Sequence, residues 1–450
     1  MRRFVIFATL AATAAGGVLP PAPAPPPAPR LVRIAGARFV AASTGLPITL
    51  AGPNVVVKGP PWLPTVSATA PACADAVDDA CAAAGTCASC TTFGAADVAR
   101  FRARGWSALR LGVIWAGAQP RDEDALDAGF LARLHALLNV TDAAGLAVVL
   151  DFHADMTGSL NCGNGVPAWF QARAGGALVG APLATAFPYS LVPGLDVAAL
   201  PGFDACGANA SAWAEFAGDA AYNLRSRCCA AMNSGNPGAL GFTTLAQATI
   251  EYMITEGPGR AAFVRYWRLL AAAVRAHPSA VAAELMNEPM TLRRTRAFDT
   301  WREAGAAIAA EVPDMAVSVA DTGEAVVLPA WAVDIIGGDE LISNETLAWI
   351  RDPESHVFLA WHWYGTPASA DDAVAEALAL GDSWRVPTLL TEFMDCDAWR
   401  AADAAAIGHL YWHYSAYCTT GPAFANSSAA PFGACILGWA AGNSNYTCGA

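Results

Sequence analysis

Two glutamates stand at the ends of apolar segments, where a purely structural strand has no need of a charge. Glu288 follows the mostly apolar run 280–286 in the stretch "AVAAELMNEPM", and Glu392 is the next-to-last residue of "VPTLLTEF". A polar turn that ends a strand is the bland interpretation of Asn287-Glu288-Pro289. Two carboxylates on opposite sides of a cleft can also hydrolyse a glycosidic bond, one as acid and one as nucleophile. The residues at the ends of the other apolar segments decide between these two interpretations.

Several further segments end in polar or aromatic residues that do not belong in a core. Taken singly, each has an ordinary structural explanation, since His153 could be a satisfied core histidine and Trp412 a core aromatic. Lys58 is the only lysine of the chain, although chance explains a single residue equally well. Polar endings on most segments are harder to attribute to chance. The set comprises Lys58, Arg110, Asp151, His153, Asp155, His362, Tyr364 and Trp412.

The elements that must position these residues alternate between apolar and helical stretches. Helices are expected at about 97–104, 127–144, 260–276 and 296–311. Continuous apolar runs are typical of parallel strands covered by helices on their outer face. Counting the strand that ends at Lys58, eight such runs occur, which predicts a (β/α)8 TIM barrel. In such a barrel the carboxyl ends of the strands share one face, so the polar endings would meet there.

The ordered set of residues resembles glycoside hydrolase family 5, over roughly residues 48–414. Three longer stretches resemble the endoglycoceramidase branch of that family: "NVVVKGPPWLP", "LRLGVIWAGAQP" and "LDFHADMTGSLNCGNGVPAWF". Asn287-Glu288-Pro289 alone would be a weak match. The third stretch is long and unusual enough to be specific.

The resemblance implies a role for each residue. Glu288 would be the acid/base and Glu392 the nucleophile, while Asn287 would bind the sugar hydroxyl next to the cleaved bond. Arg110, His362 and Tyr364 would support Glu392. The sugar subsites would be lined by Lys58, His153, Asp155 and Trp412.

The sequence also departs from that branch. Only about forty residues follow Trp412, too few for the C-terminal β-sandwich of the endoglycoceramidases, so any lipid contact made by that module is in doubt. Met394 stands in "TEFMDCD" where the family commonly has glycine. Two insertions are expected, at about 62–93 and 156–255. The second carries Trp169, Phe187, Tyr189, Trp213 and Tyr222, which would either wall a slot for a ceramide tail or simply pack against the barrel.

The amino-terminal region has the pattern of a secretory leader. Two arginines, an apolar stretch and small residues predict a signal peptide at 1–19, followed by a Pro-rich linker at 20–30. An uncleaved anchor is the alternative. Residues 31–450 are then expected to form one domain, and no later stretch reads as a membrane span.

Cysteine and asparagine patterns agree with a secretory route. The chain has 12 cysteines, which would mostly pair in an oxidising compartment, although Cys87-x-x-Cys90 could also bind zinc. Five Asn-x-Ser/Thr sequons begin at Asn139, Asn209, Asn344, Asn426 and Asn445. A secreted or lumenal protein is expected, with vacuole or lysosome as candidate compartments.

Composition narrows the classes of partner. The net charge is −13 and no basic run follows the amino terminus, so nucleic-acid binding is not expected. No metal or organic cofactor is expected, and a monomer is favoured. The expected activity is retaining hydrolysis of the bond between glycan and ceramide in a glycosphingolipid, with peripheral contact to membrane lipid. The alternatives are a glucosylceramide or steryl-glucoside β-glucosidase, an endo-β-glucanase, or a non-catalytic glycan- or lipid-binding protein.

Overall fold

Eight parallel strands close into a barrel at the centre of the molecule. The computed structural model describes residues 26–68, 92–199, 221–222, 225, 237–291, 293–320, 342–364, 369–393 and 396–412. Each neighbouring pair of barrel strands is parallel, and the ring closes where β12 pairs with β3. The predicted TIM barrel is therefore confirmed. In order around the ring the strands are β10 (Val357–Trp363), β11 (Thr388–Phe393), β12 (Gly408–Tyr411), β3 (Ala51–Val55), β6 (Ala108–Gly112), β7 (Ala147–Asp151), β8 (Ala280–Glu284) and β9 (Ala316–Ala320).

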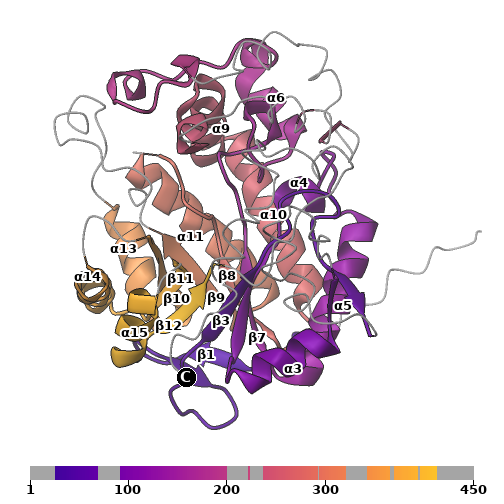
Figure 1. The fold of residues 1–450 in the computed structure, drawn as a ribbon, viewed down its shortest axis with the longest axis vertical. Helices are drawn as coiled ribbons and strands as arrows, with labels where there is room; N and C mark the ends of the chain where they lie inside the picture. Colours follow the sequence, from indigo (N-terminus) through magenta and orange to yellow (C-terminus); the bar gives the residue numbers. More distant parts are fainter. Residues whose placement is uncertain are drawn as a thin grey trace, which may run out of the picture.

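Helices cover the outside of the barrel, which explains why its strands are apolar along their whole length (Figure 1). The four helices expected from the sequence lie within two residues of the expected bounds at either end. Asp127 caps one of them, because its side chain accepts a hydrogen bond from the Phe130 amide at the start of α5. The helices are α3 (Ala95–Ala103), α4 (Trp115–Ala118), α5 (Ala128–Ala144), α6 (Ala168–Gly175), α9 (Thr244–Ile254), α10 (Pro258–Val274), α11 (Arg294–Glu311), α13 (Asn344–Arg351), α14 (Ala370–Trp384) and α15 (Cys396–Ala404).

Close packing between two barrel strands depends on a glycine. A Cβ atom on Gly52 of β3 would lie 1.8 Å from the backbone oxygen of Ala108 in β6. Any larger residue would therefore push these two strands apart. Since β3 and β6 carry Asn54 and Arg110 side by side, this contact also holds two polar groups of the barrel interior in place.

The segment before the barrel closes its amino-terminal end. A hairpin of β1 (Val32–Ile34) and β2 (Phe39–Ala41) lies at the bottom of the barrel in Figure 1. Arg30 is buried just before it and donates to the backbone oxygens of Arg275, His277 and Ala280. The amide of Ala28 also donates to Arg275. Residues 28 and 30, at the end of the expected Pro-rich linker, therefore hydrogen-bond to the segment that follows α10.

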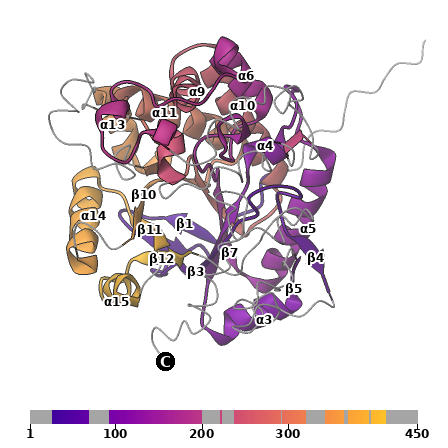
Figure 2. The ribbon, with the colours of Figure 1, turned by 45° about the horizontal axis from the view of Figure 1, so that its top comes forward.

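The two insertions leave the carboxyl ends of the strands. The first is flanked by β4 (Thr65–Ser67) and β5 (Thr92–Gly94), which pair in parallel. The second carries α6, α9 and the single 3-10 turns Ser159–Asn161, Gly176–Leu178, Tyr189–Leu191, Val197–Ala199 and Pro237–Phe242. Both views place α6 and α9 above the barrel strands (Figures 1 and 2). Another 3-10 turn, Pro353–Ser355, precedes β10.

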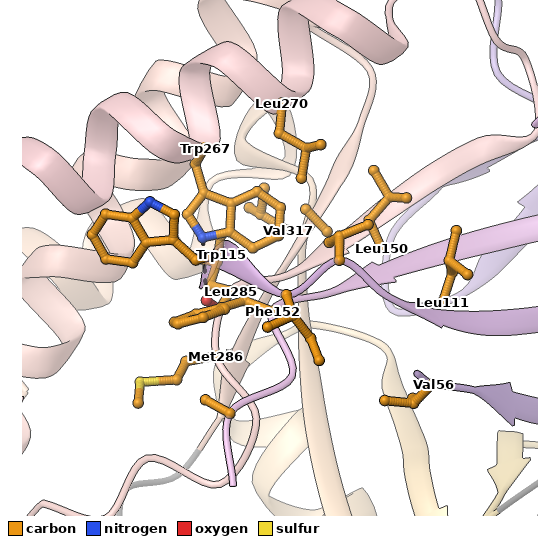
Figure 3. Close-up of a cluster of buried hydrophobic side chains, with 14 of the residues drawn as sticks. Val56, Leu111, Trp115, Leu150, Phe152, Trp267, Leu270, Leu285, Met286 and Val317 are labelled. Atoms are coloured by element: carbon orange, nitrogen blue, oxygen red, sulfur yellow. Dashed lines mark hydrogen bonds between the residues drawn. The ribbon is translucent and has the colours of Figure 1, made fainter. Parts of the chain in front are cut away.

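A dense aromatic and aliphatic cluster joins the barrel wall to α4 and α10 (Figure 3). Trp115, Phe152 and Trp267 are almost fully buried in it. The indole nitrogen of Trp267 donates to the backbone oxygen of Leu285, three residues before Glu288. Trp115 follows a polar strand end in the sequence, but the structure makes it a core residue.

Several sequence predictions fall outside the described residues. These are the signal peptide, linker residues 20–25, most of the Cys-rich insertion, Trp213 and the sequons at Asn209, Asn426 and Asn445. Asn139 and Asn344 are exposed, and Cys162 and Cys396 each take part in a disulfide bond. Within the described part of the chain, no helix combines the length and apolar character that crossing a membrane requires.

The Arg30 contacts predict a measurable contribution to stability. Arg30→Met would leave several buried carbonyl oxygens without a donor, which costs about 1–3 kcal/mol of unfolding free energy. Urea denaturation measures this loss. Arg38→Met, at an exposed position of the same hairpin, is the matched control and should change stability by less than about 0.5 kcal/mol. Equal effects of the two substitutions would contradict the anchoring role of Arg30.

Candidate active site

A completely buried arginine organises the carboxyl-terminal end of the barrel. Arg110 of β6 has no exposed surface. Its Nη1 donates to Glu392 Oε1 at 2.5 Å and to Asn54 Oδ1 at 2.8 Å. On its other edge, Nε and Nη2 each donate to Glu284 at 2.7 Å, a bidentate pair. Arg110 therefore ties strands β3, β8 and β11 together through charged or polar side chains.

Two carboxylates of this network were not among the expected site residues. Glu284 is the last residue of β8, and Asp151, the last of β7, has Oδ1 3.0 Å from Arg110 Nη2. Both are buried, and their strands pair at these positions. Asp151 was recognised as a polar strand end but given no role. Glu284 could have been found as the one charged residue that ends an otherwise apolar strand.

Glu392 is held in its ionised form. Its Oε1 contacts Arg110, and its Oε2 accepts a hydrogen bond from Tyr364 at 2.5 Å. Burial alone would raise the pKa of Glu392, but the positive charges of His362, Arg110 and His153 outweigh it and lower the pKa to about 2. A buried carboxylate that stays ionised at every physiological pH is suited to act as a nucleophile.

Glu288 lies in a different environment from Glu392. Its side chain is 24% exposed and Oε1 is 3.0 Å from His362 Nδ1. Its backbone φ of 39° is unusual for a residue with a side chain and is a form of local strain that clusters at functional sites. A β-bulge between Trp361 and His362 shifts the register of β10, which places His362 opposite Glu392 of β11.

The two glutamates face one another across a short gap. Single ligand atoms of Glu288, His362 and Glu392 all lie within 4.8 Å of one another. A metal ion could be held by such a triad, but only by a neutral histidine. Burial alone would lower the pKa of His362, yet Glu392, Glu284 and Glu288 outweigh it and raise the pKa well above its usual value. A protonated His362 acts as a cation between the carboxylates and has no lone pair for a metal.

The residues expected to line the sugar subsites form one cluster. Lys58 Nζ lies 2.7 Å from Asp155 Oδ2 and 4.4 Å from the centre of the Trp412 ring. The His153 ring stacks on Trp412, with centroids 5.1 Å apart and planes 10° from parallel. His153 also bridges Asp151 at 2.8 Å and Asp155 at 3.3 Å. This cluster joins the Arg110 network through Asp151.

Asn287 is oriented for binding through its amino group. Its Oδ1 accepts a hydrogen bond from Arg110 Nη2 at 2.8 Å. The side-chain nitrogen then remains as the donor for a ligand. The structure thus brings every expected site residue into one region: Lys58, Arg110, His153, Asp155, Asn287, Glu288, His362, Tyr364, Glu392 and Trp412.

Solved structures with the same fold are found among enzymes that act on glycolipids. An endogalactoceramidase has a TM-score of 0.51 at 19% identity, over 86% of this chain and 75% of that one. Endo-glycoceramidase II from Rhodococcus sp., in its complex with ganglioside GM3, has a TM-score of 0.53 at 17% identity, over 85% and 77%. At these identities the likeness establishes the shared fold. No protein-family model and no curated protein matches the sequence.

Because Glu284 is buried against Arg110, we expect its charge to contribute more to stability than the charge of an exposed glutamate. Glu284→Gln keeps the shape of the side chain but removes the charge that balances Arg110, so unfolding free energy should fall by about 3–5 kcal/mol. Chemical denaturation measures it. Glu303→Gln is the control, since Glu303 also pairs with an arginine, Arg260, but is itself 43% exposed. A loss no larger than that of the control would contradict the role of Glu284.

The environment of His153 predicts that the folded protein loses stability at alkaline pH. Burial alone would lower its pKa, but Asp155 and Asp151 outweigh burial and raise the pKa from 6.5 to about 9. This stabilisation is complete below the unfolded pKa of about 6.5 and is lost as pH rises through about 9, on the order of 3 kcal/mol. Melting temperatures from pH 6 to 10 test this.

The informative comparison is between the wild type and His153→Gln, which cannot ionise at that position. The wild type should lose more stability than His153→Gln over this pH range. Parallel pH profiles would show that His153 carries no proton in the folded protein.

Proposed function

We propose that this protein is a retaining β-glycosidase that cleaves the bond between glycan and ceramide in glycosphingolipids. The observation that carries the proposal is the pair Glu288 and Glu392, with carboxylate oxygens within 4.8 Å of one another. Retaining glycosidases place their carboxyl groups about 5–5.5 Å apart, whereas inverting enzymes need about 6.5–9.5 Å to admit a water. The short gap therefore supports direct attack by a carboxylate.

The surroundings of the two glutamates support different roles. Glu392, ionised and held by Arg110 and Tyr364, attacks the anomeric carbon while Glu288 transfers its proton to the departing ceramide oxygen. The carbon–oxygen bond to ceramide breaks, and a glycosyl ester forms on Glu392. Glu288, now ionised, takes a proton from water, which attacks the same carbon and releases the glycan. The positive His362 between them stabilises whichever glutamate is ionised.

We infer that the second insertion lies at the leaving-group end of the site, because it contacts the loop that carries Glu288. Gln247 of α9 donates to the backbone oxygen of Met290, two residues beyond Glu288, and so joins the insertion to the catalytic loop. Phe242 and Tyr189 pack together at 4.8 Å, and beside them Phe187 is 73% and Leu191 53% exposed. Exposed apolar side chains at this position fit a lipid aglycone better than a second sugar.

Structural neighbours and sequence motifs support the same assignment. Neighbours with a TM-score above 0.5 include an endogalactoceramidase and endo-glycoceramidase II, which belong to the branch that the sequence motifs resemble. We therefore propose membership of glycoside hydrolase family 5. Passage through the secretory pathway, disulfide bonds within the second insertion and N-glycosylation are part of the same proposal.

Product analysis tests the reaction. Wild-type protein incubated with lactosylceramide should release free lactose and intact ceramide, identified by mass spectrometry. Glu392→Gln removes the nucleophile and should reduce the rate by at least about a thousandfold. Glu345→Gln, at an exposed position of α13, is the control and should retain the wild-type rate.

Parallel incubations separate the alternatives. Turnover of glucosylceramide alone would identify a β-glucosidase, and turnover of cellotetraose alone an endo-β-glucanase. If correctly folded protein cleaves none of the three substrates, the proposed glycolipid hydrolysis is wrong.

The exposed apolar residues predict a difference between lipid and soluble substrates. Phe187→Ser should lower kcat/KM for lactosylceramide by about tenfold, since burial of a phenyl group against lipid is worth about 1.5–3 kcal/mol. Turnover of a soluble aryl β-lactoside, which has no ceramide, serves as the internal reference. Equal losses on both substrates would mean that Phe187 does not contact the lipid part.

A further inference from the structure

An asparagine in the loop that follows β7 is bonded to a carboxylate of the cluster that also contains Lys58 and His153. Asp155 Oδ2 lies 2.7 Å from the Lys58 ammonium and accepts a hydrogen bond of 2.7 Å from Asn164 Nδ2. The other carboxylate oxygen, Oδ1, lies 3.3 Å from His153 Nε2. Of the three groups that contact this carboxylate, only the Asn164 amide is a group that never carries a charge.

Asn164 meets Asp155 through its backbone as well as its side chain. Its amide donates to the Asp155 carbonyl oxygen at 2.8 Å, and its Oδ1 accepts from the Asp155 amide at 3.4 Å. The neighbouring Gly163 makes this approach possible, because a Cβ atom there would lie 2.3 Å from the Asp155 carbonyl oxygen. Close packing and three hydrogen bonds therefore fix Asp155 relative to Asn164.

Further buried amides hold the same loop. Gln171 donates to Asn161 Oδ1 at 2.7 Å, and Asn161 Nδ2 donates to the backbone oxygens of Met156 and Leu240. Met156 and Thr157 have backbone φ angles of 51° and 83°, which is rare for any side chain and most of all for a β-branched one. Such conformations persist only where the surroundings enforce them, and they cluster at functional sites. The residue after Asp155 is thus held in a strained but fixed conformation.

Asp155 can accept a further hydrogen bond from a ligand. Burial alone would raise its pKa, but Lys58 and His153 outweigh burial and lower the pKa well below its usual value. An ionised carboxylate offers about four acceptor positions. The side chain of Asp155 also remains 12% exposed. A sugar hydroxyl can therefore donate to it, provided that the carboxylate keeps its orientation.

Lys58 and Asn164 would respond differently to such a ligand. The Lys58 side chain is 28% exposed, so a sugar that contacts it competes with Asp155 for the ammonium group. Asn164 is only 3% exposed, and its amide, Nδ2 and Oδ1 all bond to Asp155. The contacts from Asn164 are therefore the ones that persist when a ligand occupies the site.

We propose that Asn164 is a positioning residue for glycan binding, which holds the Asp155 carboxylate so that its exposed edge accepts a hydrogen bond from a sugar hydroxyl. This inference deepens the proposed function and rests on it for the presence of a glycan beside Asp155. Glu392 is held by other residues, Arg110 and Tyr364. Loss of Asn164 should therefore weaken binding of the glycan and leave the chemical step almost unchanged.

Steady-state kinetics on a soluble aryl β-lactoside separate binding from chemistry. Asn164→Leu keeps the branched shape of the side chain but cannot donate to Asp155. It should raise KM about tenfold, the size of one charge-assisted hydrogen bond, while kcat changes by less than about threefold. Asn164→Ala removes the same bonds without adding volume and should behave alike, so the test does not depend on the folding of one variant.

Gln171→Met is the matched control. Gln171 is a completely buried amide of the same loop, and its hydrogen bonds go to Leu160 and Asn161. The substitution should lower the melting temperature as Asn164→Leu does, while KM stays within about twofold of the wild type. If Gln171→Met raises KM as much as Asn164→Leu, the loop has a general structural role only and the inference is wrong. A lower kcat at unchanged KM in Asn164→Leu would also overturn it.

Lys58 provides a measure of binding that requires no hydrolysis. Because it is the only lysine of the chain, protein made with isotope-labelled lysine gives a single lysine signal by NMR, next to Asp155. Titration of the Glu392→Gln protein with lactose should move that signal. Adding Asn164→Leu should raise the lactose concentration at the midpoint about tenfold, and adding Gln171→Met should not.

Together the two measurements keep this inference distinct from the proposed reaction. If the wild type cleaves the lactoside but neither KM nor the lactose midpoint depends on Asn164, hydrolysis stands and the positioning role falls. If no glycoside is cleaved but Asn164→Leu still raises the lactose midpoint, the positioning role stands and hydrolysis falls. If lactose does not move the Lys58 signal and no glycoside is cleaved, both are wrong.

Discussion

The structure depends on the completely buried guanidinium of Arg110. A buried cation is tolerated only where carboxylates and hydrogen-bond acceptors surround it, and here they come from four barrel strands or their ends. Their positions are therefore fixed relative to one another by charge as well as by the barrel backbone. Because Glu392 is one of these partners, the interaction that holds the barrel interior together also orients the proposed nucleophile.

The same network gives Glu288 and Glu392 different surroundings. Glu392 lies inside the ring of positive groups, which lowers its pKa to about 2 despite burial. Glu288 lies at the rim, partly exposed, and contacts only one of them, His362. In the proposed mechanism, two carboxyl groups of the same chemical type take different roles because their surroundings differ. The β-bulge before His362 lets a single side chain face both.

The sequence predicts the barrel and the identity of the site residues for a physical reason. Strands covered on their outer face are continuously apolar, so a charged or polar residue at a strand end such as Glu392 or His362 stands out against its neighbours. Glu284 was not among the expected site residues, and its pairing with Arg110 reveals its structural role. The contacts of Arg30 could not be predicted from a local pattern, because they join it to residues about 245 positions away.

The central claim is that Glu392 becomes covalently bonded to the sugar during the reaction. The most direct test is to incubate the protein with an activated 2-deoxy-2-fluoro-β-lactoside, which slows release of the intermediate, and to map the modified peptide by mass spectrometry. The account predicts one fluorinated disaccharide attached to the peptide that contains Glu392. A label on any other residue, or hydrolysis of natural substrate with inversion at the anomeric carbon, would contradict it.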